Sequence, residues 1–210
     1  LRRIEPVISL EQTKLIGFDI NEEIIEIAKN ISPEITYTTS WDDVVKEVEK
    51  TTKKSLIIFS SVWHEINPSY YSKIFQEMKR FDTIVIRDMK APIMGSEPID
   101  APTRERIAHR VAPWQLEEFE SKWGRIDNKE KLYHFFLMYT YLDNWDNEIK
   151  EDYFSTPWEE ISWSLEDEYD VIFSSSYTLE YKKNEIERIF GHQMKDITHH
   201  QVIYEKKENK

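Results

Sequence analysis

A short segment near the start of the chain, residues 14–30, constrains the fold more than any other part of the sequence. Its apolar residues 15–18 indicate a buried β-strand that ends at the carboxylate of Asp19. Asn21 then caps a helix that carries two glutamates in its first turn and an apolar stripe of isoleucines. A strand, an acid and a helix in this order begin a βαβ unit, which predicts an α/β fold.

The same alternation continues along the chain. Further strands are predicted at residues 35–38, 55–60 and 83–86, with helices at residues 40–48 and 70–81. The run at residues 55–60 is continuously apolar, as is typical of a central parallel strand that is buried on both faces. An aromatic-rich helical insertion over residues 92–165 precedes a strand at 169–181, a short helix at 184–190 and a last strand at 199–205. We expect one domain over residues 1–210.

Composition excludes several classes of protein. The formal net charge is −12, which repels polyanions and leaves no strong electrostatic footprint for nucleic acid. Cysteine is absent, so disulfides and thiolate metal sites are excluded and the chain is compatible with the reducing cytoplasm, where we expect it. No apolar run approaches the length of a membrane span, and no metal-ligand spacing is evident.

Acidic or basic residues follow three of the predicted strands, at the strand ends where parallel sheets bind ligands. Asp19 could accept hydrogen bonds from both hydroxyls of a ribose, or could instead be a helix-start acid that the helix dipole stabilises. His64 could act as a general base that Glu65 orients or assists, although the two could equally be a capping pair at a turn. Arg87 and Asp88 could form an internal ion pair, with contact to a substrate as the alternative.

The strand order, with these residues at the strand ends, resembles the class I S-adenosylmethionine-dependent methyltransferases. The resemblance implies a Rossmann-like sheet that is mostly parallel, is flanked by helices and ends in an antiparallel strand pair. It also implies that S-adenosylmethionine is the cofactor, with its ribose held by Asp19 and its adenine packed on Ile20. The adenine amino group would lie near Trp41, Asp42 or Asp43. Ser60 and Ser61 would lie beside the methyl donor.

The resemblance places the acceptor beside the segment that leaves the strand at residues 55–60, and at the tip of the strand at residues 83–86. His64 and Glu65 are the expected catalytic residues, and Trp63, Arg87 and Asp88 the expected substrate contacts. One family motif is missing, because the 4 glycines of the chain do not cluster into a cofactor loop. The chain begins at Leu1 rather than Met, so we expect the first strand and its glycine-rich loop to lie upstream.

Methyl transfer to a small-molecule or nucleobase acceptor is therefore the leading hypothesis. The competing hypothesis is a noncatalytic methyltransferase-like scaffold or interaction module that has lost the glycine-rich loop. Binding of another nucleotide, such as a dinucleotide, is disfavoured because the terminal strand pair suits the methyltransferase topology better. The sequence indicates neither the acceptor nor the oligomeric state.

Overall fold

The computed structural model describes residues 13–89, 97–140, 145–151, 158–193 and 198–208. The chain divides into two compact units, Leu1–Ser55 and Leu56–Lys210. The α/β fold class is confirmed, because parallel strand pairs joined by helices are followed by antiparallel C-terminal strands. The apolar spacing of residues 1–10 predicts the last turns of a helix followed by a connector, and this segment lies outside the described residues. No helix in the described ranges is long and apolar enough to cross a membrane.

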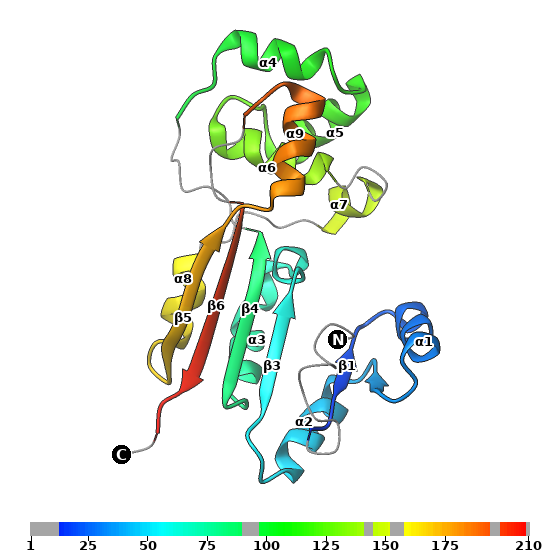
Figure 1. Ribbon diagram of the computed structural model, residues 1–210, viewed down its shortest axis with the longest axis vertical. Helices are drawn as coiled ribbons and strands as arrows, with labels where there is room; N and C mark the ends of the chain where they lie inside the picture. The colour runs from blue at the N-terminus through cyan, green and yellow to red at the C-terminus, as the bar shows by residue number, and fades with distance from the viewer. Residues whose placement is uncertain (1–12, 90–96, 141–144, 152–157, 194–197, 209–210) are drawn as a thin grey trace. The chain divides into compact units, whose positions relative to one another are not determined.

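The first unit is one βαβ unit followed by a further helix (Figure 1). Its elements are β1 (Ile16–Phe18), α1 (Glu22–Ile31), β2 (Thr36–Thr38) and α2 (Trp41–Lys50), and β1 pairs with β2 in parallel. Both helices begin where the sequence predicts, because Asn21 and Ser40 accept hydrogen bonds from backbone N–H groups in the first turns.

The apolar stripe of α1 is only partly buried. Ile25 is buried, whereas Ile24 and Ile27 are about half exposed. Only one edge of the predicted stripe therefore contributes to the core of this unit.

The second unit is built on a four-stranded sheet in the order β3-β4-β6-β5. Its strands are β3 (Leu56–Ser60), β4 (Thr83–Met89), β5 (Tyr169–Tyr177) and β6 (His199–Lys206). β3 and β4 are parallel, and β6 runs antiparallel to both of its neighbours. The expected antiparallel pairing of the last two strands is confirmed.

One face of this sheet is covered by two helices, α3 (Tyr71–Met78) and α8 (Trp158–Leu165) (Figure 1). Phe75, Met78 and Ile161 from these helices pack against Ile84, Ile86, Val202 and Tyr204 of the strands. The Tyr169 hydroxyl donates to the Phe81 carbonyl at 2.6 Å, which joins the start of β5 to the end of the α3 segment.

The expectation that residues 55–60 are buried on both faces is wrong. Leu56 is 53% exposed and Ile58 is 39% exposed, while Ile57 and Phe59 on the other face pack into the core. Among the strands that the structure describes, β3 pairs only with β4 and lies at the sheet edge. A continuous apolar run fits an edge strand with one open face as well as a central strand, so the sequence could not separate the two.

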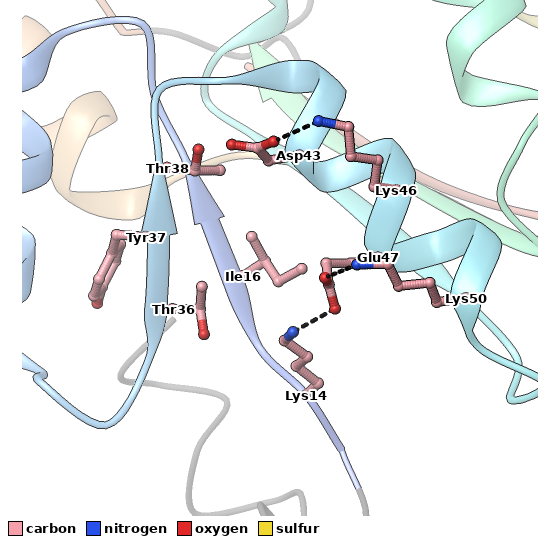
Figure 2. A pocket seen from close by; sticks show the side chains of 9 residues that line it. All are labelled: Lys14, Ile16, Thr36, Tyr37, Thr38, Asp43, Lys46, Glu47 and Lys50. Atoms are coloured by element: carbon pink, nitrogen blue, oxygen red, sulfur yellow. Dashed lines mark hydrogen bonds and ion pairs between the residues drawn. The ribbon is translucent and has the colours of Figure 1, made fainter.

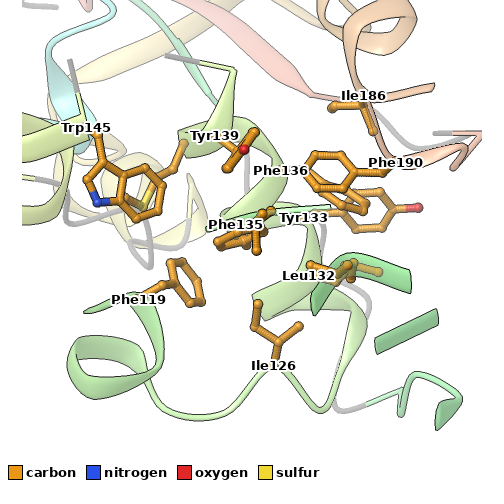
Figure 3. Close-up of a cluster of buried hydrophobic side chains, with 13 residues drawn as sticks. Phe119, Ile126, Leu132, Tyr133, Phe135, Phe136, Tyr139, Trp145, Ile186 and Phe190 are labelled. Carbon is orange, nitrogen blue, oxygen red and sulfur yellow. The ribbon is translucent and has the colours of Figure 1, made fainter. Parts of the chain in front are cut away.

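The remaining helices share a second hydrophobic core (Figure 3). They are α4 (Ala101–Ala108), α5 (Pro113–Trp123), α6 (Lys129–Tyr139), α7 (Trp145–Glu151) and α9 (Glu180–Phe190). Every residue of α6 from Leu132 to Tyr139 is buried, as the sequence predicts for a helix that is apolar all round. Phe119, Trp145 and Phe190 from three neighbouring helices contact this central helix.

The predicted strand at residues 169–181 ends earlier, at Tyr177, and α9 begins at Glu180 rather than at residue 184. The reason is a tertiary cap, because the backbone N–H of Leu179 donates to the Thr198 hydroxyl at 3.1 Å. Leu179 has no side chain that could cap the helix itself. The start of α9 thus depends on a residue nineteen positions away, which local sequence does not reveal.

The helical core predicts that two phenylalanines contribute very differently to the free energy of unfolding. Phe135 is fully buried on α6, whereas Phe173 on β5 is 45% exposed. Phe135→Ala should lower the free energy of unfolding by about 3–5 kcal/mol, because it leaves a cavity among aromatic rings. The matched control Phe173→Ala should cost less than about 1 kcal/mol. Urea denaturation followed by circular dichroism measures both, and equal losses would contradict this packing.

Candidate active site

The first unit carries several of the predicted cofactor contacts, two of them at the tip of β1. Asp19 is half-buried, and its Oδ1 accepts a hydrogen bond from the backbone N–H of Asn21 at 2.9 Å. The described residues place no salt bridge on this carboxylate. Ile20, which follows it, is 85% exposed, and Asp42 is exposed in the first turn of α2. A carboxylate with an adjacent exposed apolar side chain fits the ribose and base of a nucleoside, and these roles remain predictions.

A pocket of about 270 Å³ lies between the two strands and α2 of the same unit (Figure 2). Its lining side chains are Lys14, Ile16, Thr36, Tyr37, Thr38, Asp43, Lys46, Glu47 and Lys50. Glu47 binds both Lys14 and Lys50, and these ammonium groups lower the pKa of its carboxyl to about 2. Asp43 pairs with Lys46 at 3.1 Å. Because the three lysines and two carboxylates of the pocket are all in ion pairs with one another, we assign no ligand to it. Of the residues predicted to lie at the cofactor, only Asp43, one of the three candidates for the adenine amino group, lines this pocket.

The carboxyl ends of β3 and β4 in the second unit bring other predicted residues together. The parallel register pairs Ser60 with Arg87, so the exit of β3 lies beside the tip of β4. Ser61 donates its backbone N–H to the Arg87 carbonyl at 2.8 Å and has a φ of 55°. A serine in this left-handed region is uncommon, and the conformation turns the chain sharply out of the strand. Ser60 and Ser61 are both exposed at this turn.

Asp88 organises the segment that follows the turn. This segment, η2 (Trp63–Glu65), is a single 3-10 turn without a side-chain cap of its own. The Oδ2 atom of Asp88 accepts the backbone N–H groups of Val62, Trp63 and His64 at 3.1, 2.6 and 3.2 Å. Asp88 is only 2% exposed, so these donors replace the water that a buried carboxylate needs. Asp88 is therefore a remote cap for η2.

The other oxygen of Asp88 holds the imidazole of His64. His64 Nδ1 lies 2.6 Å from Asp88 Oδ1, and the ring is 8% exposed. An ionised carboxylate accepts but does not donate, so neutral His64 carries its proton on Nδ1 and presents Nε2 as the basic atom. The carboxylate of the exposed Glu65 lies 3.8 Å from this Nε2. The arrangement can orient a histidine for proton transfer.

The internal ion pair expected between Arg87 and Asp88 is not formed. Neighbouring residues of a strand point to opposite faces, and Asp88 faces His64. The guanidinium of Arg87 lies instead over the ring of Tyr177 on β5, 5.8 Å from the ring centroid. With its oxygens bound to backbone and imidazole, Asp88 is a positioning residue in this structure.

Trp63 lies in the sheet core. Its ring is 3% exposed and stacks on Tyr71 with centroids 5.1 Å apart, and Phe59 and Phe75 also contact it. Its indole Nε1 is buried without a hydrogen-bond partner. The predicted contact between Trp63 and a substrate remains a prediction.

Sequence analysis gave no role to two other buried side chains of the second unit, His199 and Lys182. His199 is 2% exposed at the start of β6, its Nδ1 lies 2.7 Å from the Thr198 hydroxyl, and its ring stacks on Tyr177. Burial, with the nearby charges of Lys182 and Arg87, lowers the pKa of His199 to about 4. The only signal in the sequence was the histidine pair at residues 199 and 200, whose alternation puts one ring on each face.

Lys182 on α9 is fully buried and donates to the Thr140 hydroxyl at 3.1 Å. Burial lowers the pKa of its ammonium group to about 7, and the charge of the buried Glu148 opposes that shift. A lysine on the inner face of an otherwise amphipathic helix was not predicted, because lysine is almost never fully buried.

The bond between His64 and Asp88 predicts a specific tautomer. In histidine-labelled protein at about pH 8, the ¹⁵N spectrum should show His64 protonated at Nδ1 and unprotonated at Nε2. In Asp88→Asn the amide oxygen is held by the three backbone N–H groups, so the amide N–H₂ faces His64 Nδ1 and donates to it. The His64 signals should therefore move toward the pattern in which Nε2 carries the proton. A wild-type His64 protonated at Nε2 would contradict the geometry.

Lys182 and His199 also predict how stability depends on pH. Both have a lower pKa in the folded than in the unfolded state, so the unfolded chain binds more protons and stability rises with pH. Between about pH 7 and about pH 9.5, Lys182 alone should add about 3 kcal/mol to the free energy of unfolding.

Chemical denaturation at several pH values measures this slope. Lys182→Met should remove most of it, whereas Lys183→Met, at the half-exposed neighbouring position, should leave it intact. Identical slopes in all three proteins would show that the Lys182 ammonium does not lose its proton in the folded state.

Several solved structures are similar to this chain. A SAM dependent methyltransferase from Archaeoglobus fulgidus is 15% identical, with a TM-score of 0.46 over 91% of this chain and 75% of that one. The N-methyltransferase NodS from Bradyrhizobium japonicum is 9% identical, with a TM-score of 0.43 over 93% of this chain and 74% of that one. The PH0226 protein from Pyrococcus horikoshii is 9% identical, with a TM-score of 0.42 over 94% and 73%.

No protein-family model matches the sequence, and no curated protein matches it. These solved structures, two of them described as methyltransferases, are 9 to 15% identical to this chain, a level at which no acceptor and no site residue carries over.

Proposed function

We propose that this chain binds S-adenosylmethionine and transfers its methyl group to an acceptor that loses a proton in the reaction. The observation that carries the proposal is the His64–Asp88 pair, an imidazole fixed by a buried carboxylate at the carboxyl ends of two parallel strands. In open α/β sheets, ligands bind outside this edge. The proposal also rests on the resemblance of the strand order to class I methyltransferases.

The first unit supplies the residues that would hold the cofactor. The Asp19 carboxylate is partly exposed and free of salt bridges in the described residues, so it can accept hydrogen bonds from ribose hydroxyls. Ile20 offers an exposed apolar surface to an adenine ring, and Asp42 an exposed acceptor for its amino group. The bound cofactor would supply a methyl group on a sulfonium centre, which reacts with nucleophiles.

The second unit supplies the proton chemistry. Nε2 of His64 can take a proton from a hydroxyl or amine of the acceptor, which raises its nucleophilicity. Asp88 stabilises the imidazolium that forms and keeps the ring from rotating. Glu65, close to Nε2, can then receive the proton and pass it to solvent. Positioning also lowers the barrier of an in-line displacement, so the base is one contribution among several.

Calorimetry with S-adenosylhomocysteine tests the cofactor site. The wild-type chain should bind it, and Asp19→Ala should weaken binding at least about tenfold, because two hydrogen bonds to a carboxylate are worth more than about 1.4 kcal/mol. Glu34→Ala removes one exposed carboxylate of the same unit and is the matched control, which should bind like wild type. Absence of binding by the wild-type chain would favour the scaffold hypothesis, and equal binding by Asp19→Ala would remove Asp19 from the site.

A further inference from the structure

The carboxylate of Glu65 lies beside the basic atom of His64. Its Oε1 is 3.8 Å from His64 Nε2, and the Glu65 side chain is 46% exposed, so molecules in solution can reach it. Both residues belong to the single turn η2, which Asp88 holds in place through three backbone N–H groups. An acidic group is therefore positioned at the atom to which the proposed function assigns proton transfer.

Both of these atoms accept hydrogen bonds, and neither donates one. Asp88 keeps the proton of neutral His64 on Nδ1, which leaves Nε2 as an acceptor, and an ionised carboxylate only accepts. Their separation of 3.8 Å exceeds the length of a hydrogen bond, about 3 Å, so the two atoms are not hydrogen-bonded to each other. A group that binds at both atoms must bring two donors.

A hydroxyl and a protonated amine differ in the number of donors that they bring. A hydroxyl has one, so an alcohol that donates to His64 Nε2 turns an oxygen lone pair toward the Glu65 carboxylate. A protonated primary amine has three N–H groups and can donate one to each of the two atoms. Hydrogen bonds from a cation are also about twice as strong as those between neutral groups. The two acceptors therefore suit an ammonium ion better than a hydroxyl.

The charges around η2 also favour a cation. Asp88 and Glu65 lie on either side of the imidazole of His64, so the three side chains carry two negative charges while the imidazole is neutral. The formal net charge of the whole chain is −12, which attracts cations at long range.

Two basic side chains near the tip of β4 are engaged elsewhere. The guanidinium of Arg87 lies over Tyr177 on the opposite face of the sheet from Asp88. His200 is the register partner of Asp88 on β6 and shares its face, and its Nδ1 lies 2.6 Å from the Ser176 hydroxyl. Arg87 thus directs its charge away from the candidate site.

The charge that develops during methyl transfer favours an amine for a separate reason. When nitrogen attacks, positive charge moves from the sulfur of S-adenosylmethionine to that nitrogen, and nearby carboxylates stabilise it. When a hydroxyl attacks, negative charge develops on its oxygen as the proton leaves, and the same carboxylates oppose it. The electrostatics of Asp88 and Glu65 thus lower the barrier for one class of acceptor and raise it for the other.

We propose that the methyl acceptor is an amine, which Glu65 binds as its ammonium ion. The inference rests on the proposed function and names its substrate class. His64 Nε2 takes one proton from R–NH₃⁺, and the lone pair of the resulting R–NH₂ forms a bond to the methyl carbon. The electron pair of the broken C–S bond stays on sulfur, so the products are S-adenosylhomocysteine and R–NH₂⁺–CH₃. The proton on His64 then passes to solvent.

Histidine-labelled protein tests the ammonium site without S-adenosylmethionine. The probe is benzylamine, which is protonated near neutral pH, and benzyl alcohol is its hydroxyl counterpart. Benzylamine should shift the ¹⁵N signal of His64 Nε2 in a saturable way, and benzyl alcohol should bind at least about tenfold more weakly. Equal binding of the two compounds, or no response of His64 to benzylamine, would overturn the proposal.

Variants of Glu65 locate the charge that binds the probe. Glu65→Gln should weaken benzylamine binding at least about tenfold and leave benzyl alcohol binding unchanged. Glu65→Asp keeps the charge on a shorter side chain, so it should bind benzylamine more tightly than Glu65→Gln, and it covers the case in which the glutamine variant is misfolded. Glu105→Gln removes an exposed carboxylate on α4 and is the matched control, which should bind like wild type. Wild-type affinity in Glu65→Gln would overturn the role of Glu65.

Transfer of a radiolabelled methyl group separates this inference from the proposed function. In matched pairs of amines and alcohols, label should enter the amines. Label in alcohols alone would leave methyl transfer intact and overturn the amine. Absence of S-adenosylhomocysteine binding would instead remove the proposed function, while the benzylamine titration, which uses no cofactor, would still show whether Glu65 and His64 bind an ammonium ion.

Discussion

The carboxylate of Asp88 is the interaction on which the rest of the candidate site depends. One of its oxygens collects three successive backbone N–H groups from the exit of β3, and the other holds the His64 ring. The chain leaves β3 through a left-handed serine, a conformation that needs support from its surroundings. Asp88 supplies that support from the neighbouring strand. The same buried group therefore sets both the path of the backbone and the orientation of the imidazole.

Strand alternation at the tip of β4 separates two functions that the sequence places side by side. Asp88 faces the helices and organises His64, whereas Arg87 faces the other side, over Tyr177. Adjacent opposite charges in a strand cannot pair with each other easily, because their side chains diverge. The separation makes Asp88 a positioning group for His64 and places the guanidinium of Arg87 over Tyr177 on the other face.

Local signals in the sequence predicted most of the elements. Asn21 and Ser40 mark helix starts through a contact two or three residues away, so their caps are visible in the sequence. The contacts that shape the site are not local. His64 meets Asp88 across 24 positions, and that pairing follows only from the parallel register of β3 and β4. The early end of β5 has a similar origin, because the Thr198 hydroxyl caps the helix that replaces the predicted strand end.

The exposure of β3 was missed for a different reason. Leu56 and Ile58 belong to a run whose composition suits a central strand, and only the strand order shows an open face. Burial of Lys182 was also beyond sequence reasoning, since it depends on helices α6 and α7 that pack around α9. Whether a segment forms a helix or a strand can be predicted from local patterns. The polar contacts of the site depend on how the strands pair and how the helices pack in the folded chain.

The most direct test of the account is transfer of a radiolabelled methyl group from S-adenosylmethionine to a panel of small molecules that carry a hydroxyl or an amine. The account predicts label in at least one of these compounds with the wild-type chain. At about pH 7, a loss of about 100-fold or more is expected in His64→Gln, because the base that takes the acceptor proton is gone. Equal transfer by the wild-type chain and His64→Gln would contradict a catalytic role for the imidazole that Asp88 holds.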